Sequence, residues 1–387
     1  MKTNYRQTTA TIDLSAYKNN IELVKKFASS SKIMAVIKSN AYGHGMLATA
    51  QFIKNDVEAF AVSSIDEAIF LRENKLHNQI VILEGFQEID EISIIIEYGL
   101  IPVIHHQYQL DLFKKHIQSK SIQSPISIWI KLDTGMNRLG FKSNELELLA
   151  NDLTILCESV NIIGFMSHYA CADEPEHDLN GSQQVNFTNM LNTLLLNLNG
   201  QTNISNQYEL DNYQLSFSNS AAILSLPEAH FHWVRPGVVL YGINPLSQRD
   251  ESINQSLKAV MQFTSRVIAI KKLQKGDTVG YGASYKANQD KVIAIISVGY
   301  GDGYPRHAGT GTPMMINGHR VELVGRVSMD MICCDISHLS SGSVNIGDRV
   351  ELWGHSISVS EIADHAGTIA YELVCGITSR VQYIYQD

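Results

Sequence analysis

The sequence has few cysteines, and none of them forms a Cys-x-x-Cys pair. There are five among 387 residues, an odd number that includes the adjacent Cys333 and Cys334. This spacing fits neither a disulfide framework nor a zinc site, so we expect reduced thiols and no bound metal. No apolar run approaches the ~18 residues needed to cross a bilayer, and the amino terminus lacks the apolar segment of a secretion signal. We therefore predict a cytoplasmic protein that does not enter the membrane.

Positive charge is also scarce. The chain carries 30 Lys and Arg residues against 39 Asp and Glu residues, for a formal net charge of −9. A chain of this charge repels a phosphate backbone and an anionic lipid surface alike, so we expect no nucleic-acid partner. At roughly 150 residues per domain, the length predicts two or three domains, and a hydrophobic content of 44% is enough for real cores.

Eight short apolar runs alternate with helical patterns in the first part of the chain. The runs are Ile33–Ile37, Ala59–Val62, Ile80–Leu83, Ile101–Ile104, Ile126–Leu132, Ile162–Met166, Gln214–Phe217 and His232–Val234. The segments between them space their apolar residues at the 3.6-residue period of a helix. Eight strand–helix units favour a (β/α)8 barrel of the TIM type over an open sheet. We predict that this α/β barrel occupies residues 1–244.

The pattern changes after Gly242. A polar stretch that contains Pro245 is suited to a linker, and short apolar runs bounded by turn residues follow it. Only one helical pattern is clear in this part, near Ser360–His365. We predict a mostly-β carboxyl-terminal domain over residues 245–387.

Lys38 directly follows the first predicted strand, at the end of a barrel strand where active sites lie. Most lysines are solvated, but an amine desolvated among apolar walls has a lowered pKa and can form an imine with a carbonyl. Position alone does not choose between these readings. The stretch Gly43–Ala48 also fits G-x-G-x-x-A, but five residues separate it from the strand, and the second run ends in Ser63–Ser64 rather than an acid. A dinucleotide site is therefore only a weak alternative.

Two other predicted strands end near basic side chains. Arg138 lies in a glycine-bounded loop after the fifth run, where its guanidinium fork is suited to a carboxylate. His168 follows the sixth run. Each could be a surface or structural residue by itself, but together with Lys38 at one barrel mouth they favour a functional site.

The seventh and eighth predicted strands end in groups that suit a phosphate. Ser220 offers a hydroxyl, and Gly237 and Val238 offer backbone N–H groups, in loops that often bind phosphate in βα barrels. A phosphate site beside an imine-forming lysine is what pyridoxal 5′-phosphate requires. Arg235 would then lie within reach of the pyridine nitrogen.

With these residues assembled, the sequence resembles the alanine racemase family of fold-type III pyridoxal-phosphate enzymes. The matching blocks keep the family's order along nearly the whole chain: 35–45, 131–141, 166–173, 218–222, 235–242, 280–285, 298–303, 324–330 and 370–375. The resemblance implies interconversion of L-alanine and D-alanine, which supplies D-alanine for cell-wall peptidoglycan. Asn137 stands where some relatives carry another small residue, which puts little in doubt.

The resemblance also implies residue roles and a homodimer. Lys38 would carry the cofactor and act as one base, and Tyr281 would come from the partner subunit as the other. The cofactor-binding residues would be Lys38, Tyr42, His168, Asn219, Ser220, Arg235, Gly237, Val238 and Tyr371. Arg138, Tyr300 and the partner's Met329 would contact the substrate, with support from Asp330 and from Lys131, which is carbamylated in some members of this family.

Three alternatives remain open within this resemblance. A racemase of broader specificity would accept serine or another small amino acid. A decarboxylase of the same fold type would be expected to have Glu or Asp in place of Arg235. A non-catalytic pyridoxal-phosphate-binding protein would resemble only the first 240 residues and lack the β-domain that carries Tyr281. We interpret the remaining histidines, including His105 and His106, as structural.

Overall fold

The computed structural model describes residues 5–119, 124–200, 209–248 and 251–387 of the chain. Eight parallel strands close into a barrel in chain order, with the last strand paired back to the first through Ile33 and Val234. The strands are β2 (Lys32–Val36), β3 (Ala59–Val62), β4 (Gln79–Ile82), β5 (Ile101–Ile104), β6 (Ile126–Lys131), β7 (Val160–Met166), β8 (Gln214–Ser216) and β9 (Trp233–Val234). Each corresponds to one of the eight predicted apolar runs, and the predicted barrel is confirmed.

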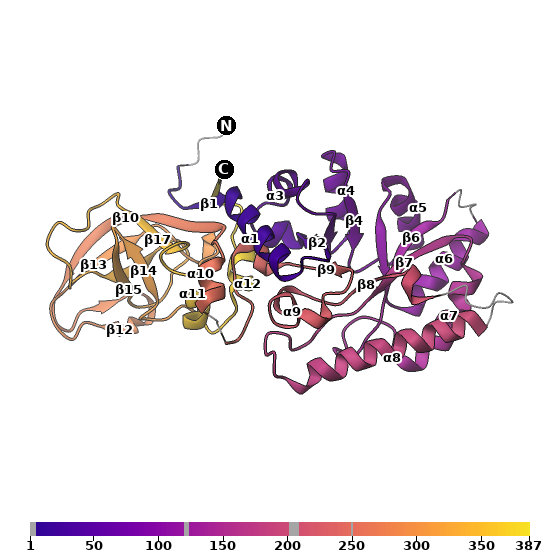
Figure 1. Cartoon of the computed structure of the whole chain (residues 1–387). Coiled ribbons are helices and arrows are strands. Elements are labelled where there is room, and N and C mark those ends of the chain that lie inside the picture. Colours follow the sequence, from indigo (N-terminus) through magenta and orange to yellow (C-terminus); the bar gives the residue numbers. More distant parts are fainter. Residues whose placement is uncertain (1–4, 120–123, 201–208, 249–250) are drawn as a thin grey trace.

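Helices surround the barrel in the right-hand body of Figure 1. Each strand is short and largely buried, because it is covered by side chains of the barrel interior on one face and by helices on the other. The helices are α1 (Leu14–Phe27), α3 (Met46–Ile53), α4 (Ile65–Glu73), α5 (Ile89–Tyr98), α6 (Gln107–Ser119), α7 (Leu146–Ile155), α8 (Asp178–Gly200) and α9 (Ser220–Ser225). No helix among the described residues is long and apolar enough to cross a membrane.

The carboxyl-terminal part forms an eight-stranded sheet in the order β13-β16-β15-β14-β17-β10-β1-β18, and β13 also pairs with β10. A small β11–β12 hairpin lies outside this sheet. The new strands are β10 (Met261–Leu273), β11 (Thr278–Val279), β12 (Tyr285–Lys286), β13 (Lys291–Ile296), β14 (Pro313–Ile316), β15 (His319–Leu323), β16 (Ile332–Asp335), β17 (Arg349–Trp353) and β18 (Gln382–Gln386). The helices are α10 (Glu251–Ser256), α11 (Val359–Ala366) and α12 (Ala370–Cys375). The predicted mostly-β character of this part is confirmed.

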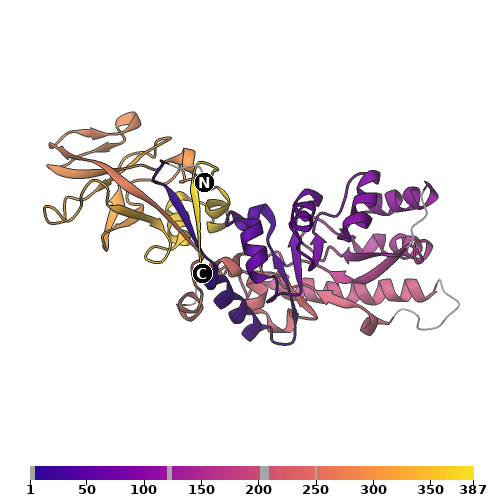
Figure 2. The ribbon, with the colours of Figure 1, turned by 90° about the horizontal axis from the view of Figure 1, so that it is seen from above.

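The first strand, β1 (Thr9–Asp13), is where the structure corrects the sequence analysis. The prediction that the barrel begins at residue 1 was wrong for this segment, because β1 pairs with β10 and β18 of the carboxyl-terminal sheet. Figure 2 shows β1 beside β18 at the junction of the two bodies. A closed barrel has no free strand edge to which β1 could be added, whereas an open sheet has one. In the carboxyl-terminal sheet the side chains of Ala10 and Ile12 are fully buried. Asp13 then caps α1 and leads the chain into the barrel.

Two elements near the expected linker were not predicted. Part of the polar stretch forms helix α10, and the long strand β10 follows it. Part of the signal for β10 is present in the sequence, since the apolar Met261, Phe263 and Val267 stand at alternate positions on the first half of the strand and are buried. Because β10 is long, it pairs with three strands, β1, β13 and β17, and so connects the two parts of the sheet.

Candidate active site

Lys38 begins a short left-handed turn, and one residue separates it from the end of β2. This turn, α2 (Lys38–Tyr42), contains four successive residues with φ between 50° and 54°, from Ser39 to Tyr42, and none of them is glycine. The left-handed conformation costs an L-residue about 1–2 kcal/mol, so neighbouring groups must hold the turn in place. Gly43, which ends the turn, packs so closely on α12 that an added Cβ would lie 1.9 Å from the carbonyl oxygen of Val374.

The turn opens onto a cavity of about 1320 Å³ at the carboxyl ends of the barrel strands. This volume is ample for a cofactor together with a small substrate. Most of the predicted site residues line it: Lys38, Tyr42, Lys131, Arg138, His168, Asn219, Ser220, Arg235, Gly237, Val238 and Tyr371. The tertiary structure therefore brings together residues from the ends of five barrel strands and from α12.

One end of the cavity has the groups expected to hold a phosphate. The Ser220 hydroxyl, at the start of α9, accepts a hydrogen bond from the Gly237 N–H at 2.8 Å. A Cβ added to Gly237 would lie 2.6 Å from the Tyr42 hydroxyl, so the glycine is required for this close approach. Burial raises the pKa of Tyr371 to about 12 and that of Tyr42 still further, with the neighbouring Tyr371 adding to the shift at Tyr42. Both phenols therefore stay protonated and can donate hydrogen bonds.

Arg235 is buried in the lining of the cavity, and its hydrogen-bond partners are neutral groups. Its guanidinium donates to the Ser216 hydroxyl at 2.6 Å and to the carbonyl oxygens of Ser167 and Phe217 at 2.5 and 3.2 Å. No carboxylate of the described residues forms an ion pair with it. Burial, followed by the charge of Arg138, lowers the pKa of Arg235 to about 10. The side chain therefore remains a cation at neutral pH.

His168 contacts Arg235 through one ring nitrogen. Arg235 Nη2 lies 3.2 Å from Nδ1 of His168, and a guanidinium can only donate, so Nδ1 is the acceptor. Burial, and next the charges of Arg235 and Lys131, lower the pKa of His168 well below its ordinary value. The ring is therefore neutral and carries its proton on Nε2. This nitrogen lies 3.5 Å from Nδ2 of Asn219, which is also a donor, so the Nε2–H group remains available for another acceptor.

Lys131 and Arg138 add further positive charge to the cavity. Burial lowers the pKa of Lys131 to about 7, and the charges of Arg235, Arg138 and Lys38 act in the same direction. An amine with this pKa is partly neutral at physiological pH. A cavity lined by these cations favours anionic ligands, such as a phosphate or a carboxylate.

The other predicted site residues lie in the carboxyl-terminal part, outside the lining of this cavity. Tyr281, between β11 and β12, is 71% exposed, Met329 is 52% exposed and Tyr300 is 40% exposed. The β12 strand that follows Tyr281 lies in the left-hand body of Figure 1, apart from the barrel. The Asp330 carboxylate accepts a hydrogen bond from Arg380 at 2.6 Å. A single chain therefore does not bring these four residues to Lys38.

Sequence reasoning missed several residues at the rim of the cavity. Glu84, His105 and His106 line it, although the histidines had been interpreted as structural. The imidazole Nε2 of His105 lies 3.0 Å from the carbonyl oxygen of Glu84. Their position directly after β4 and β5 was the signal that could have found them, since strand ends form the mouth of a barrel. Within the described part of the chain, no cluster of His, Cys, Asp and Glu could hold a metal ion.

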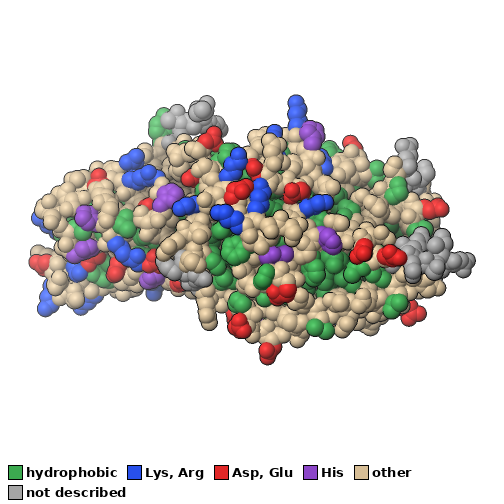
Figure 3. Space-filling model, in the orientation of Figure 1, with side chains coloured by type: hydrophobic (Ala, Val, Ile, Leu, Met, Phe, Trp, Pro, Cys, Tyr) green, Lys and Arg blue, Asp and Glu red, His purple; other side chains and the backbone are tan. Residues whose placement is uncertain are grey.

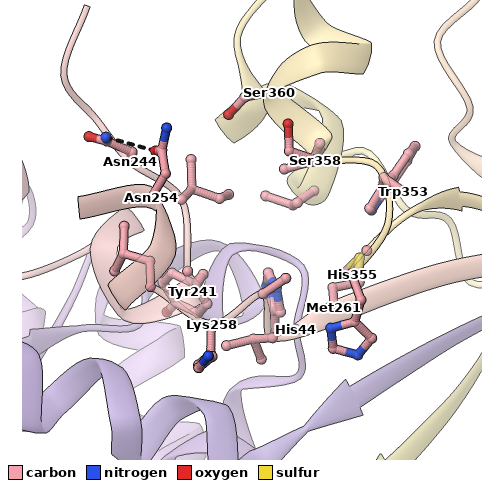
Figure 4. Close-up of a pocket in the computed structure, with 18 residues that line it drawn as sticks. His44, Tyr241, Asn244, Asn254, Lys258, Met261, Trp353, His355, Ser358 and Ser360 are labelled. Atoms are coloured by element: carbon pink, nitrogen blue, oxygen red, sulfur yellow. Dashed lines mark hydrogen bonds between the residues drawn. The ribbon is translucent and has the colours of Figure 1, made fainter. Parts of the chain in front are cut away.

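A second cavity, of about 420 Å³, is lined by residues of the barrel and of the carboxyl-terminal part. Figure 4 shows His44 and Tyr241 from the barrel side and Ser358 from the start of α11 around it. The dashed line marks the hydrogen bond from Asn244 to Asn254, at 2.9 Å. None of the predicted site residues lines this cavity.

The chain forms an eight-stranded α/β barrel that is followed by a β-domain. One mouth of the barrel carries an amine, phosphate-binding donors and a buried guanidinium. Together these features define a barrel-type pyridoxal-phosphate enzyme. Comparison with known families narrows this class. The family model for the amino-terminal domain of alanine racemase matches residues 12–245, and that for the carboxyl-terminal domain matches residues 260–385. The chain belongs to the alanine racemase family, and it is therefore an isomerase whose cofactor is pyridoxal phosphate.

Individual relatives resemble the chain over almost its full length. It is 41% identical to the alanine racemase of Thioalkalivibrio sulfidiphilus, over 98% of this chain and 99% of the relative. It is 40% identical to that of Coxiella burnetii, over 98% of both. The biosynthetic alanine racemase of Pseudomonas aeruginosa superposes with a TM-score of 0.89 at 37% identity, covering 99% of this chain and all of that one. The Bartonella henselae alanine racemase, solved with covalently bound pyridoxal phosphate, gives 0.86 at 29% identity, over 98% and 99%.

Proposed function

We propose that the interconversion of L-alanine and D-alanine by this chain uses two bases, Lys38 and Tyr281 of the partner subunit. The observation that carries these roles is the division of the predicted site. Lys38, Arg235 and His168 line one cavity, while Tyr281 projects 71% exposed from the other body of the molecule. A second copy of the chain would bring such an exposed tyrosine to the cavity.

The residues of the cavity fit pyridoxal phosphate. Tyr42, Ser220, Tyr371 and the N–H groups of Gly237 and Val238 would hold the phosphate, with Asn219 beside them. The cationic lining and the close approach at Gly237 support this assignment. When bound, the cofactor supplies an aldehyde for the Lys38 amine and an electron-withdrawing ring that makes the α-hydrogen of an attached amino acid acidic.

Arg235 restricts the chemistry of the site. It would face the pyridine nitrogen, and at neutral pH it remains cationic, so it donates a hydrogen bond there without transferring a proton. A carboxylic acid at this place would protonate the ring and strengthen its electron withdrawal. The arginine therefore favours simple proton exchange over a decarboxylase, which is the closest alternative among enzymes of this fold.

His168 would tune the tyrosine. Its neutral ring, with the proton on Nε2, can donate a hydrogen bond to the phenolate oxygen of Tyr281 of the partner subunit. Such a donor, together with the nearby charge of Arg235, would stabilise the phenolate form of the tyrosine. Tyr281 can then remove the α-hydrogen of L-alanine, while the Lys38 amine serves the opposite face for D-alanine.

The substrate carboxylate would be bound by Arg138 and by the backbone of the partner's Met329. Asp330, the residue after Met329, would support this backbone. Tyr300 would narrow the entrance to the cavity. Lys131 would brace Arg138 as a carbamate. Its lowered pKa supports this, because only a neutral amine adds carbon dioxide, forming an N–C bond and releasing one proton. The negative carbamate would then pair with a guanidinium.

A head-to-tail homodimer follows from these roles. Tyr281, Met329 and Met331 are between 45% and 71% exposed, so their side chains are accessible to a second copy of the chain. Figure 3 shows hydrophobic side chains gathered over the barrel half of the molecule as well, above helix α8. Dilution to monomers should abolish activity, as equilibrium sedimentation with parallel assays would measure. An active monomer would overturn the composite site.

We further infer that the D-alanine supplies peptidoglycan synthesis in the cytoplasm, where the five free thiols would persist. We also infer that the chain divides into two domains near residues 244 and 245, with β1 belonging to the second.

Two measurements test the proposal. Borohydride reduction of the holoenzyme followed by peptide mass spectrometry should place the pyridoxyl adduct on Lys38, and an adduct on another side chain, or none, would overturn it. Incubation with single L-amino acids should yield D-alanine far faster than D-serine. Comparable rates would favour the racemase of broader specificity, and no interconversion would favour a cofactor-binding protein without catalysis.

A further inference from the structure

The carboxylate of Glu67 joins the loops that follow two neighbouring barrel strands. Its Oε1 accepts the N–H of Ser39 at 2.7 Å, and its Oε2 accepts the N–H of Ser63 at 2.8 Å. Ser39 is the residue after Lys38, and Ser63 is the residue after β3. Glu67 itself lies in the first turn of α4, on neither loop.

The sequence around Glu67 would suggest a different use. Ser64 is the N-cap of α4, and its hydroxyl accepts the N–H of Glu67, so Ser64 and Glu67 have the spacing of a capping box. In that motif the glutamate would return to the backbone N–H of the N-cap residue. Here both carboxylate oxygens bind N–H groups outside the helix. The acidic side chain therefore serves the loops of the barrel mouth rather than its own helix.

The N–H of Ser39 needs such an acceptor. The internal bonds of the left-handed turn run from Ala41 N–H to the Ile37 carbonyl at 2.8 Å and from Gly43 N–H to the Ser39 carbonyl at 3.0 Å, and neither satisfies the Ser39 N–H. Of the described residues, only Glu67 accepts the Ser39 N–H. Because the backbone from Ser39 to Tyr42 is unfavourable for non-glycine residues, an anchor at its first peptide bond fixes where the turn starts.

Further hydrogen bonds connect Ser63, one of the two residues that Glu67 binds, to the ends of β4 and β5. The Ser63 hydroxyl donates to Oε1 of Glu84 at 2.5 Å, and His105 lies 3.0 Å from the Glu84 carbonyl oxygen. A continuous chain of hydrogen bonds thus connects the ends of β2, β3, β4 and β5 around half of the barrel mouth. Lys38 lies at the first end of this chain.

We propose that Glu67 is a positioning residue for Lys38, a role that rests on the proposed function of that lysine. By accepting the Ser39 and Ser63 N–H groups together, it fixes the peptide bond after Lys38 relative to the barrel and so aims the amine into the cavity. Glu67 does not contact substrate or cofactor in this proposal, and it transfers no proton.

The test compares Glu67→Gln with Asp66→Asn. Glutamine has one acceptor oxygen and places its NH2 donor against the second N–H, so it can serve only one loop. Asp66→Asn removes the same charge from the same helical turn, at an exposed residue that binds neither loop. In Glu67→Gln we expect kcat to fall by roughly 10- to 100-fold with little change in KM, since a small misplacement of a reacting group has effects of this size. Amide hydrogen exchange of the holoenzyme should accelerate in the peptides that contain Ser39 and Ser63, while Asp66→Asn should match the wild type in both measurements.

Glu67→Asp covers the case in which Glu67→Gln does not fold. It keeps the charge but is one methylene shorter, so it should reach only one of the two N–H groups and show the same faster exchange at Ser39 or Ser63. If folded Glu67→Gln or Glu67→Asp equals Asp66→Asn in kcat and in exchange, the positioning role is overturned. The pyridoxyl adduct of the reduced wild-type enzyme separates the two hypotheses. An adduct away from Lys38 refutes the proposed function, whereas an adduct on Lys38 with unaltered Glu67 variants refutes only the positioning role.

Discussion

Nη2 of Arg235 lies 3.2 Å from Nδ1 of His168, and this contact determines which nitrogen of the imidazole carries the proton. A guanidinium has no lone pair to offer, so His168 must accept at Nδ1 and keep its proton on Nε2. The contact thus turns a neutral histidine into a donor that faces the cavity. The role proposed for Tyr281 depends on this donor.

The first prediction concerns the pH dependence of His168→Leu. Removal of the Nε2–H donor should leave the phenolate of the partner's Tyr281 without a stabilising hydrogen bond, and the tyrosine must be ionised to act as a base. The acidic limb of kcat/KM for L-alanine should therefore move to higher pH by about one unit, equivalent to about 1.4 kcal/mol. His106→Leu, on the exposed rim of the same cavity, should leave the limb in place. An unmoved limb in His168→Leu would show that the histidine does not tune the tyrosine.

The second prediction concerns the direction of proton transfer in Tyr281→Phe. Loss of the phenol should slow racemisation by roughly 10²- to 10⁴-fold, the range of general-base catalysis. Exchange of the α-hydrogen with deuterated solvent should be lost from L-alanine more than from D-alanine, because Lys38 still serves the D face. Tyr285→Phe, in the adjacent strand β12, is the matched control. Equal and mild losses with both enantiomers would refute the assignment of Tyr281.

The third prediction concerns Lys131 and stability. Its pKa is about 7 in the folded chain and about 10.5 when exposed, so between these values the unfolded chain binds more protons. The free energy of unfolding should therefore rise from pH 7 to pH 10 in the wild type relative to Lys131→Met, in urea titrations of the apoprotein in buffer free of carbon dioxide. Lys115→Met, at an exposed site, should show no such trend. A constant difference between wild type and Lys131→Met would mean that Lys131 titrates normally.

The fourth prediction concerns Asp302, which lies two residues after Tyr300 and is fully buried. Its carboxylate pairs with Arg6 and Arg380 and accepts the Gly299 N–H at 2.9 Å. Asp302→Asn removes the buried charge that pairs with the partly exposed Arg6 and Arg380, and the loss of these charged hydrogen bonds should cost about 1.5–3 kcal/mol in urea unfolding. Asp330→Asn, which removes a half-exposed partner of Arg380, should cost clearly less. Similar losses in the two variants would show that burial does not strengthen this ion pair.

The barrel could be predicted because its strands carry a local signal. Most of the eight runs are short, largely apolar and separated by segments of helical period, and this pattern belongs to a strand buried on both faces. The first strand, β1, carries an equally clear alternation, with Ala10 and Ile12 buried. This pattern indicates that one face of the strand is buried, but it does not indicate which sheet the strand joins. Its pairing with β10 and β18 therefore could not be predicted.

The candidate site shows the same division. The residues that carry the chemistry, such as Lys38 and Arg235, stand directly after predicted strands, and the geometry of a barrel then sends them to one mouth. Glu67 could not be found in this way, because Ser64 and Glu67 have the spacing of a helix cap. Only the folded chain reveals that both carboxylate oxygens bind N–H groups elsewhere.

The sequence by itself determined the strand and helix periods, the placement of basic and phosphate-binding groups at strand ends, and the family. These properties are local, since side-chain pattern and chain order are enough to define them. The tertiary structure alone decided the sheet that β1 joins, the tautomer of His168, the lowered pKa of Lys131 and the hydrogen bond from the Lys38 turn to Glu67. Each of these depends on distances between groups far apart in the chain, and hydrogen bonds and electrostatic interactions act only once folding has brought such groups within a few ångströms.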